Sequence, residues 1–540
     1  MTSTPTSSTP LLQPQQSASP AFYKLLTRKR RQKKRGILLL TVVLPTIAVI
    51  IIAFLIWDVS SLGNCYALPL CQMLDNGRGA ERGWWENQGP YAPFRSMGKA
   101  GAQAGLPRGC EIDQVTLLQR HTARFPTTKA AKCMLGALEK LDNREIKMPR
   151  LHPEFAFLTE VDFSLKDWRF DNLTDQGRKA AWNSGRQIAA QYKGFLCKAK
   201  DVFSRSSGGE RVIETSRYWL EGFRQHRFIL KDKSQLPHVD LIIPEGNSFN
   251  NTLSVHSCPA FNALNPSPGE LAQRQLTSSL LMPALHRLND VLCPRPRLRI
   301  DELVCMADMC AFDSQARGTS WKGWSKWCSI FTQDEWEILG HGKDIKRFYE
   351  VGQGSEYGPT MGAGYINEII ARLTDSAPVD HTITNRTLDN NEATFPRGGE
   401  LFFIDFGHDN EMLAVMAALG ILKQHRPPPI NQVPPKRTYT LSHIVPFGAR
   451  LTFERITCDT GNWEPDRNAE DPENRGDGMK GYVRILVNDE VHQISNIACE
   501  QSSLAEHGLC EIDAFVKSQY FATTSVNWNI CFTENDLSSG

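Results

Sequence analysis

The chain has 540 residues, a formal net charge of +2, and 41% hydrophobic and 22% charged residues. This length allows two or three domains, and the apolar fraction is sufficient for a sizeable globular core. A nearly neutral chain lacks the strong basic excess of dedicated nucleic-acid-binding proteins, so we expect no nucleic-acid partner.

The N-terminal part of the chain differs in composition from the rest. Residues 1–36 combine a Ser/Thr/Pro/Gln-rich stretch with a basic run at Arg28–Arg35, which predicts a disordered cytosolic tail. Ile37–Trp57 follows without a charge, and a membrane-crossing helix needs about 20 such residues. Because the basic run precedes the span, we expect a type II signal anchor with the rest of the chain outside the cytosol. A cleaved signal peptide is the alternative.

The cysteines and the glycosylation motifs support the same topology. All 14 cysteines lie after residue 60, and none forms a CxxC pair or a zinc-type cluster with histidines. Asn-x-Thr sequons occur at Asn172, Asn250 and Asn385. We therefore expect a disulfide-bonded glycoprotein at the cell surface, in the secretory pathway or in a vacuole lumen. Buried free thiols are the alternative reading of the cysteines.

Residues 58–108 are expected to form a stem and an N-terminal wrap, and residues 109–540 a catalytic domain. Within that domain, strand-like runs alternate with helical patterns, which predicts an α/β fold. The stretch from roughly 255 to 390 has few strand signals and is expected to be a helical insertion. The strand-like runs are Gln114–Leu118 and Leu401–Phe406, and the clearest helical patterns are Gly177–Lys193, Glu214–Phe228 and Leu271–Val291.

A segment directly after the first strand-like run carries the strongest chemical signal. It reads Arg120-His121-Thr122-Ala123-Arg124-Phe125-Pro126. Arginine presents planar donors that match phosphate oxygens and stays charged at any useful pH. A neutral imidazole between two such groups can attack a bound phosphorus atom. The pattern predicts a nucleophilic His121, although a surface salt-bridge cluster would also fit these residue types.

Two further segments extend this pattern. The second strand-like run ends in His408-Asp409, where the histidine could bind phosphate and the carboxylic acid could protonate a leaving alcohol. The segment from Phe203 to Val212 places Arg205 in a Ser/Gly-rich turn before a helix, which is suited to anion binding. Alone, each would be read as a polar turn.

The three segments resemble the histidine acid phosphatase family, and in particular its fungal phytase-like branch. The resemblance covers most of the chain after about residue 64 and includes the stretches Asp308–Asp313, Phe331–Trp336 and Gly358–Tyr365. It implies a large α/β domain similar to phosphoglycerate mutases with a smaller, mainly helical inserted domain, and a site that needs no metal or other cofactor. It also implies roles for single residues: His121 as the phosphorylated nucleophile, Asp409 as proton donor, and Arg120, Arg124, Arg205 and His408 as phosphate ligands.

The resemblance leaves the substrate open between phytate (myo-inositol hexakisphosphate) and a broad range of phosphomonoesters. Lys129 and Lys132 resemble phytase lysines that would favour an anionic ring, but they could equally be solvent-exposed helix residues. The family usually has glycine where this chain has Thr122, so strain at that position would produce a catalytically weak phosphate-binding surface protein instead. A mutase-type phosphotransferase is a further alternative, against which Asp409 and the secretory features argue.

The resemblance also implies a set of disulfides. Four cysteines, Cys133, Cys197, Cys293 and Cys305, are left without an implied partner. The implied pairs are Cys65–Cys71, Cys110–Cys458, Cys258–Cys531, Cys310–Cys328 and Cys499–Cys510.

Overall fold

The computed structural model describes most of the chain after residue 83. All described residues belong to one compact unit, Gly79–Gly540. The predicted anchor Ile37–Trp57 and the basic run lie outside the described residues, and within the described part no helix is both long and apolar enough to cross a membrane. The described ranges are 84–98, 106–142, 153–197, 201–226, 238–246, 249–292, 296–317, 323–397, 401–459, 479–494, 497–501 and 504–532.

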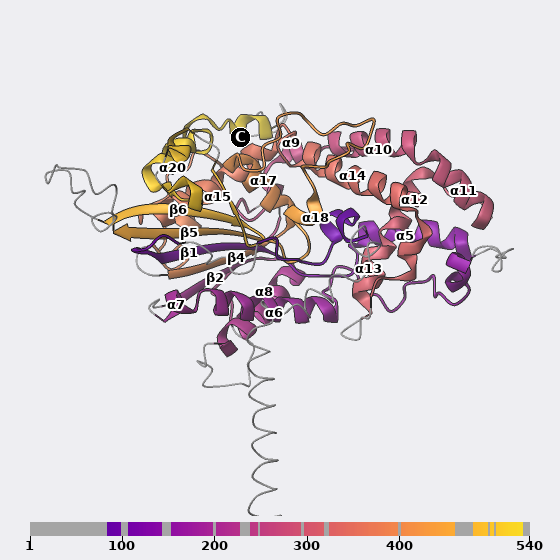
Figure 1. Cartoon of the computed structure of the whole chain (residues 1–540), viewed down its shortest axis with the longest axis horizontal. Helices are drawn as coiled ribbons and strands as arrows, with labels where there is room; N and C mark the ends of the chain where they lie inside the picture. The colour runs from indigo at the N-terminus through magenta and orange to yellow at the C-terminus, as the bar shows by residue number, and fades with distance from the viewer. Residues whose placement is uncertain are drawn as a thin grey trace, which may run out of the picture. The chain divides into compact units, whose positions relative to one another are not determined.

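A mixed β-sheet forms the centre of this unit (Figure 1). Its strand order is β3-β2-β4-β1-β5-β6-β7, with β8 paired to β6. The first four of these strands are parallel and the others antiparallel. The strands are β1 (Cys110–Arg120), β2 (Asp201–Ser207), β3 (Leu241–Ile243), β4 (Leu401–Gly407), β5 (Arg450–Asp459), β6 (Met479–Val487), β7 (Glu490–His492) and β8 (Cys510–Glu511).

Both faces of the sheet are covered by helices, as expected for parallel strands that read as continuous apolar runs. In β1 every residue from Gln114 to Arg120 is buried. Helices α6 (Asp175–Gln191) and α8 (Glu210–His226) cover one face, and α15 (Gly358–Leu373) and α17 (Asp409–Leu419) cover the other (Figure 1). The α/β architecture predicted from the alternating patterns is therefore confirmed.

Two glycines allow the close packing of α6 on α8. A Cβ atom on Gly185 would lie 1.9 Å from the carbonyl oxygen of Trp219, and one on Gly222 would lie 2.0 Å from that of Trp182. No side chain fits at such distances, so the backbones of the two helices touch where glycine is present. This contact fixes α8, whose first turn contributes to the site described below.

The described residues between β3 and β4 are helical or irregular, in agreement with the helical content expected for 255–390. They do not all form a separate layer, because α15 packs into the same apolar core as α17 and the sheet. A second apolar core joins α5 (Thr128–Asp142) to α11 (Met282–Leu292), α12 (Ile300–Ala307), α13 (Met309–Ala316) and α14 (Gln333–Glu350). Residues of α9 (Pro259–Asn262) and α16 (Arg386–Asp389) pack against the first core, and α10 (Pro268–Leu280) packs on α14 in a small core of its own.

Two of the predicted helices have different limits in the structure. The pattern Leu271–Val291 forms two helices, α10 and α11, with a break at Leu281. Pro283 lies in the first turn of α11, where its missing N–H and its ring would interrupt a continuous helix. Helix α8 begins at Glu210, four residues earlier than the predicted start at Glu214.

The N-terminal wrap is present in its described part, residues 84–98. The indole of Trp85 stacks on His443 with 5.1 Å between ring centroids, and the carbonyl oxygen of Ala92 accepts a hydrogen bond from the Phe447 amide at 2.9 Å. The carbonyl oxygen of Pro90 accepts a hydrogen bond from the Arg120 side chain. The wrap therefore contacts the end of β1 and the segment that precedes β5.

Four of the implied disulfides are confirmed, and a fifth forms between two of the cysteines left open. The confirmed pairs are Cys110–Cys458, Cys258–Cys531, Cys310–Cys328 and Cys499–Cys510. Cys133 pairs with Cys305 and links α5 to α12. Cys197 is exposed and has no disulfide partner among the described residues. Cys65, Cys71 and Cys293 lie outside the described residues. These five bridges indicate folding in an oxidising, extracytoplasmic compartment.

Candidate active site

The ends of β1 and β4 bring two sequence motifs together. The two strands are parallel neighbours, and their register pairs Arg120 with Gly407. His121 and His408 therefore leave the sheet side by side, with 5.4 Å between their ring centroids. The His121 amide donates a hydrogen bond to the Gly407 carbonyl oxygen at 3.0 Å, which fixes the two chain segments to each other. This is the carboxyl edge of the parallel strands, where α/β folds place their sites.

His121 is oriented for nucleophilic attack through Nε2. Its Nδ1 lies 2.9 Å from the carbonyl oxygen of Thr122, which assigns the proton of the neutral ring to Nδ1 and leaves the lone pair of Nε2 free. The side chain is buried. Burial and the nearby charges of Arg120 and Arg124 lower the pKa of His121 well below its usual range, so the free imidazole is neutral.

Thr122 is accommodated without backbone strain. It is not among the described non-glycine residues with a positive φ. Its hydroxyl donates a hydrogen bond to the Gly177 carbonyl oxygen at 2.9 Å, and its amide donates to the Thr215 hydroxyl at 3.2 Å. The positive φ near this position belongs to Gly448, at +77°. The replacement of the family glycine by threonine therefore leaves the orientation of His121 intact.

Arg120 and Arg124 extend from the same segment and are buried against one aromatic ring. Their guanidinium carbons lie 4.7 Å and 5.8 Å from the ring centroid of Phe447. Burial lowers the pKa of Arg124 to about 10, which still leaves it charged at neutral and acidic pH. The Nε atoms of both arginines are buried and have no hydrogen-bond partner within the described part of the chain. Such unpaired donors favour an anion as their partner.

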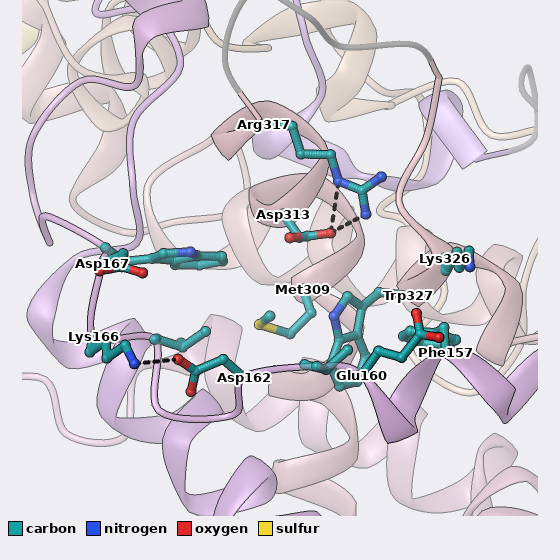
Figure 2. A pocket seen from close by; sticks show the side chains of 13 residues that line it. Phe157, Glu160, Asp162, Lys166, Asp167, Met309, Asp313, Arg317, Lys326 and Trp327 are labelled. Carbon is teal, nitrogen blue, oxygen red and sulfur yellow. Dashed lines mark hydrogen bonds and ion pairs between the residues drawn. The ribbon is translucent and has the colours of Figure 1, made fainter.

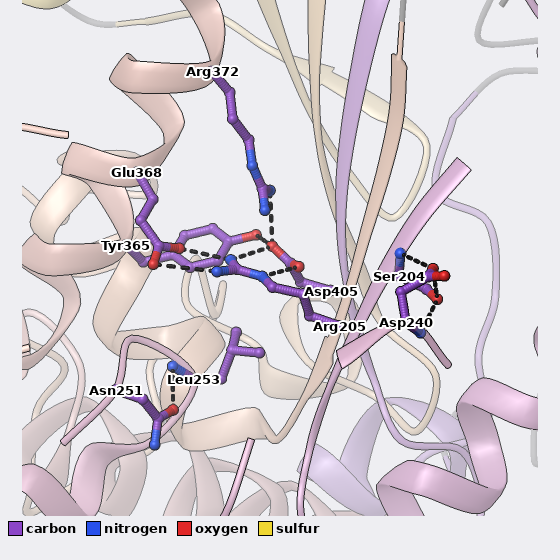
Figure 3. A network of polar contacts seen from close by, with 9 residues as sticks. All are labelled: Ser204, Arg205, Asp240, Asn251, Leu253, Tyr365, Glu368, Arg372 and Asp405. Carbon is purple, nitrogen blue, oxygen red and sulfur yellow. Dashed lines mark hydrogen bonds and ion pairs between the residues drawn. The ribbon is translucent and has the colours of Figure 1, made fainter. Parts of the chain in front are cut away.

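Arg205 is not brought to this group by the structure, unlike the other residues predicted to bind phosphate (Figure 3). It lies in β2 and points toward α15, where Nε is 2.7 Å from Asp405 and Nη2 is 2.6 Å from Glu368. The side chain is 1% exposed. Its donors are satisfied by two carboxylates, and breaking these buried pairs to bind a phosphate would leave both carboxylates uncompensated.

Arg211 occupies the place that the sequence prediction gave to Arg205. It is in the first turn of α8, and its Nη2 lies 3.2 Å from Nδ1 of His408. Its Nε is buried and, among the described residues, has no hydrogen-bond partner. Its charge also contributes to the lowered pKa of His121. The available signal was the Gly-Gly-Glu turn: a helix predicted to begin there would have placed Arg211 beside the site.

Asp409 is the first residue of α17 and faces the arginines. Its Oδ2 lies 3.3 Å from Arg120 and 3.7 Å from Arg347, a residue of α14 that the sequence prediction missed. Burial alone would raise the pKa of Asp409, but these two charges outweigh burial and hold it below its usual range. The carboxylate is therefore ionised while the site is free. It can serve as an acid only after a bound anion has weakened its contact with the arginines.

Helix ends add to the positive potential. The backbone of His408 occupies the N-cap position of α17, and Arg211 lies in the first turn of α8. Amide groups at helix N-termini attract anions. Arg120, His121, Arg124, Arg211 and His408 therefore surround a position suited to a phosphoryl group, with Asp409 beside it.

The two predicted substrate lysines and a nearby pocket lie outside this group. Lys129 and Lys132 are exposed on α5. A pocket of about 400 Å³ is formed by residues 157–168 together with α13 and the segment that contains Trp327 (Figure 2). It contains none of the predicted site residues. Its charged side chains nearly balance in sign, with three basic residues against four acidic ones.

Comparison with known proteins identifies the family. The sequence model of the histidine phosphatase superfamily (branch 2) matches residues 111–488. Phytase A of Emericella nidulans is 33% identical over 452 residues, covering 82% of this chain and 90% of the relative. Phytase A of Aspergillus fumigatus is 32% identical over 481 residues, covering 88% and 96% of the two chains.

Solved structures agree with this at the level of the fold. The phytase from D. castellii has a TM-score of 0.61 at 22% identity, covering 83% of this chain and 87% of that one. The multiple inositol polyphosphate phosphatase of Bifidobacterium longum in complex with phosphate has a TM-score of 0.58 at 12% identity, covering 82% and 98%. The chain belongs to branch 2 of the histidine phosphatase superfamily. It is a fungal phytase-like histidine acid phosphatase, a phosphoric monoester hydrolase.

Proposed function

We propose that this phosphatase works through a phosphohistidine at His121 and that its preferred substrate is phytate. Nε2 of His121 attacks phosphorus, the bond from phosphorus to the ester oxygen breaks, and Asp409 transfers a proton to the departing oxygen. Water then cleaves the phosphorus–nitrogen bond and releases phosphate. The observation that carries the proposal is the free Nε2 of a neutral His121 beside three arginines, of which Arg124 forms no ion pair with any described residue.

Each remaining side chain has a role in this reaction. Arg120, Arg124 and Arg211 bind the phosphoryl oxygens and stabilise the charge that develops on them, together with His408. Phosphate bound to Arg120 competes with Asp409 for the same guanidinium, so the negative charge favours protonation of the carboxyl group. Acidic solution supplies that proton. We therefore expect activity to be greatest at acidic pH.

Phytate as substrate is supported by two observations. The two relatives named above are phytases, and one of the similar solved structures is an inositol polyphosphate phosphatase. The exposed Lys129 and Lys132 of α5 could contact further phosphates of a highly charged ring. Phosphate release at acidic pH should be faster from phytate than from a simple alkyl phosphate at equal concentration. Equal rates, or a preference for the alkyl ester, would indicate a broad-specificity acid phosphatase.

A catalytically weak phosphate-binding surface protein is the alternative function. Its main support was the threonine at position 122, and the unstrained backbone of that residue removes this support. The deciding experiment is chemical. The full-length enzyme, quenched during turnover, should carry acid-labile, base-stable phosphate, and the His121→Ala variant should carry none. Label that persists in the variant would require another nucleophile, and absence of label from the wild type would favour the weak binder.

For the N-terminal part we propose a cytosolic tail (1–36), a membrane anchor (37–57) and a stem that leads into the wrap (58–108). The apolar Ile37–Trp57 after the basic run supports this topology. Asn172, Asn250 and Asn385 would then be accessible to glycosylation, and each is only partly buried. Glycosidase treatment should increase electrophoretic mobility. Three unmodified asparagines together with protection of the C-terminus from protease added to sealed cells would contradict the topology.

A further inference from the structure

His408 is held between a cation and a carboxylate. Its Nδ1 lies 3.2 Å from Nη2 of Arg211, and its Nε2 lies 2.7 Å from Oε1 of Glu245. Arginine can only donate and a carboxylate can only accept, so in this ligand-free contact Nδ1 accepts from Arg211 and Nε2 donates to Glu245. A phosphoryl oxygen beside Nδ1 can only accept, so His408 binds it in the protonated form, in which both ring nitrogens donate. Glu245 follows β3, and no sequence motif indicated it.

Glu245 is itself fixed on the turn before α8. Its Oε1 accepts hydrogen bonds from the Ser207 hydroxyl at 2.6 Å and from the Gly209 amide at 2.9 Å. A Cβ atom on Gly209 would lie 2.8 Å from the same oxygen, so the glycine allows the carboxylate to approach the backbone. Burial alone would raise the pKa of Glu245, but these hydrogen bonds and the neighbouring His408 and Arg211 lower it to about 2. The carboxylate is therefore charged and fixed at the working pH.

This arrangement determines which edge of the His408 ring faces Arg211. The bond between an imidazole and its Cβ atom allows two broad ring orientations, so the backbone does not select one. A hydrogen bond to an ionised acceptor is stronger than one to a neutral acceptor and selects a single orientation. We propose that Glu245 is a positioning residue for phosphoryl transfer, because its carboxylate holds His408 with Nδ1 toward Arg211 and the bound phosphoryl group.

This inference rests on the proposed phosphohistidine mechanism and makes a specific prediction for paired variants. Glu245→Ala should lower the single-turnover rate of phosphoenzyme formation in the full-length enzyme by roughly 10- to 100-fold, the usual effect of losing a partner that orients a site histidine. If the effect of Glu245 on the reaction passes through His408, the double variant Glu245→Ala/His408→Ala should be no slower than His408→Ala alone. Glu210→Ala, which removes an exposed carboxylate from the first turn of α8, is the matched control and should keep the wild-type rate.

Glu245→Gln keeps an acceptor oxygen of the same reach and tests whether the loss is due to misfolding. It should recover most of the rate, with a thermal midpoint close to that of the wild type. A glutamine variant as slow as the alanine variant would overturn the positioning role. So would a double variant whose loss equals the product of the two single losses. If instead the wild type forms no phosphohistidine at His121, the proposed function itself fails. That outcome comes from labelling the wild type alone and does not depend on the paired variants.

Discussion

The molecule contains two buried groups of arginines, and they differ in how many carboxylates balance their charge. In the first, Arg205 and Arg372 are paired with Asp405 and Glu368, and Tyr365 donates a further hydrogen bond to Asp405 at 2.9 Å (Figure 3). Positive and negative charges balance there, and each of these side chains is buried. In the second, Arg120, Arg124 and Arg211 surround His121, and among the described residues their carboxylate contacts are Asp409, 3.3 Å from Arg120, and Asp171, 3.9 Å from Arg211.

The comparison shows how a structural buried arginine differs from one that binds a ligand. A guanidinium that is fully satisfied by carboxylates stabilises the fold and has no capacity left for a ligand. A group with excess positive charge carries an electrostatic cost that a bound anion would remove. Unpaired donors alone do not separate the two groups, because Nε and Nη2 of Arg372 in the first group also have no hydrogen-bond partner among the described residues. The number of arginines does not separate the two cases. The number of carboxylates within contact distance does.

The largest expected effect comes from neutralising Asp409, the carboxylate beside Arg120 in the second group. Asp409→Asn keeps the size of the side chain but removes the acid. Hydrolysis of alkyl phosphates should fall by roughly 10² to 10⁴, the usual contribution of general acid catalysis. In an activated aryl ester such as p-nitrophenyl phosphate, the phenolate leaving group departs without protonation. Single-turnover phosphorylation of the enzyme by this substrate should therefore be affected far less. An equal loss with both substrates would mean that Asp409 is not the leaving-group acid.

A matched pair of variants tests the comparison itself. Arg211→Ala should lower kcat/KM by about 10² to 10³, the effect of losing one charge-stabilising donor, and should leave the denaturation midpoint almost unchanged. Glu368→Ala, which removes a carboxylate from the first group, should lower the free energy of unfolding by about 3 kcal/mol. It should keep near wild-type activity well below its new midpoint, because α15 contributes no side chain to the site.

Exchanged effects of the two variants would contradict the assignment of Arg211 to the phosphate site and of Arg205 to the structural group. An Arg211→Ala enzyme that keeps its activity and loses stability would belong with the balanced group. A Glu368→Ala enzyme that is stable but inactive would mean that Arg205 reaches the substrate after all. Urea denaturation and steady-state kinetics on the same preparations separate these outcomes.

The sequence was sufficient for the parts of the site that are local in the chain. Arg120, His121, Arg124, His408 and Asp409 each follow directly on an apolar strand, and parallel pairing of the two strands brings their ends together. The α/β fold was predicted on the same kind of local evidence, whereas the four confirmed disulfides were predicted from the family resemblance alone.

The remaining parts depend on contacts between distant segments. Arg205 and Arg211 stand six residues apart in one polar turn, and only the carboxylates Glu368 and Asp405 decide which of them is already satisfied. Arg347 reaches Asp409 from the last turns of α14, beyond the family-like stretch Phe331–Trp336 at the start of that helix. Similarly, Cys133 and Cys305 are 172 residues apart, and only the packing of α5 against α12 brings them together.

The smallest expected effect is a difference in how the two groups change the free energy of unfolding as the pH falls. The pKa of His121 is lowered in the folded chain, whereas an unfolded histidine titrates near 6.5. Below about pH 6.5 the unfolded state therefore binds a proton that the folded state resists, and stability falls toward the folded pKa by at most about 1.4 kcal/mol per pH unit. Asp405 has a pKa held below its usual range, so the stability from the balanced group is lost only below about pH 3.9.

This difference can be measured with His121→Asn, which cannot titrate. Between pH 6.5 and 4 its free energy of unfolding should fall less steeply than that of the wild type, and the two curves should become parallel above pH 7. The control is His507→Asn, because the His507 side chain is 30% exposed and lies in a short 3-10 helix outside the site. That variant should follow the wild-type curve. Identical slopes for His121→Asn and the wild type would show that the buried histidine is already protonated, and the neutral nucleophile would have to be abandoned.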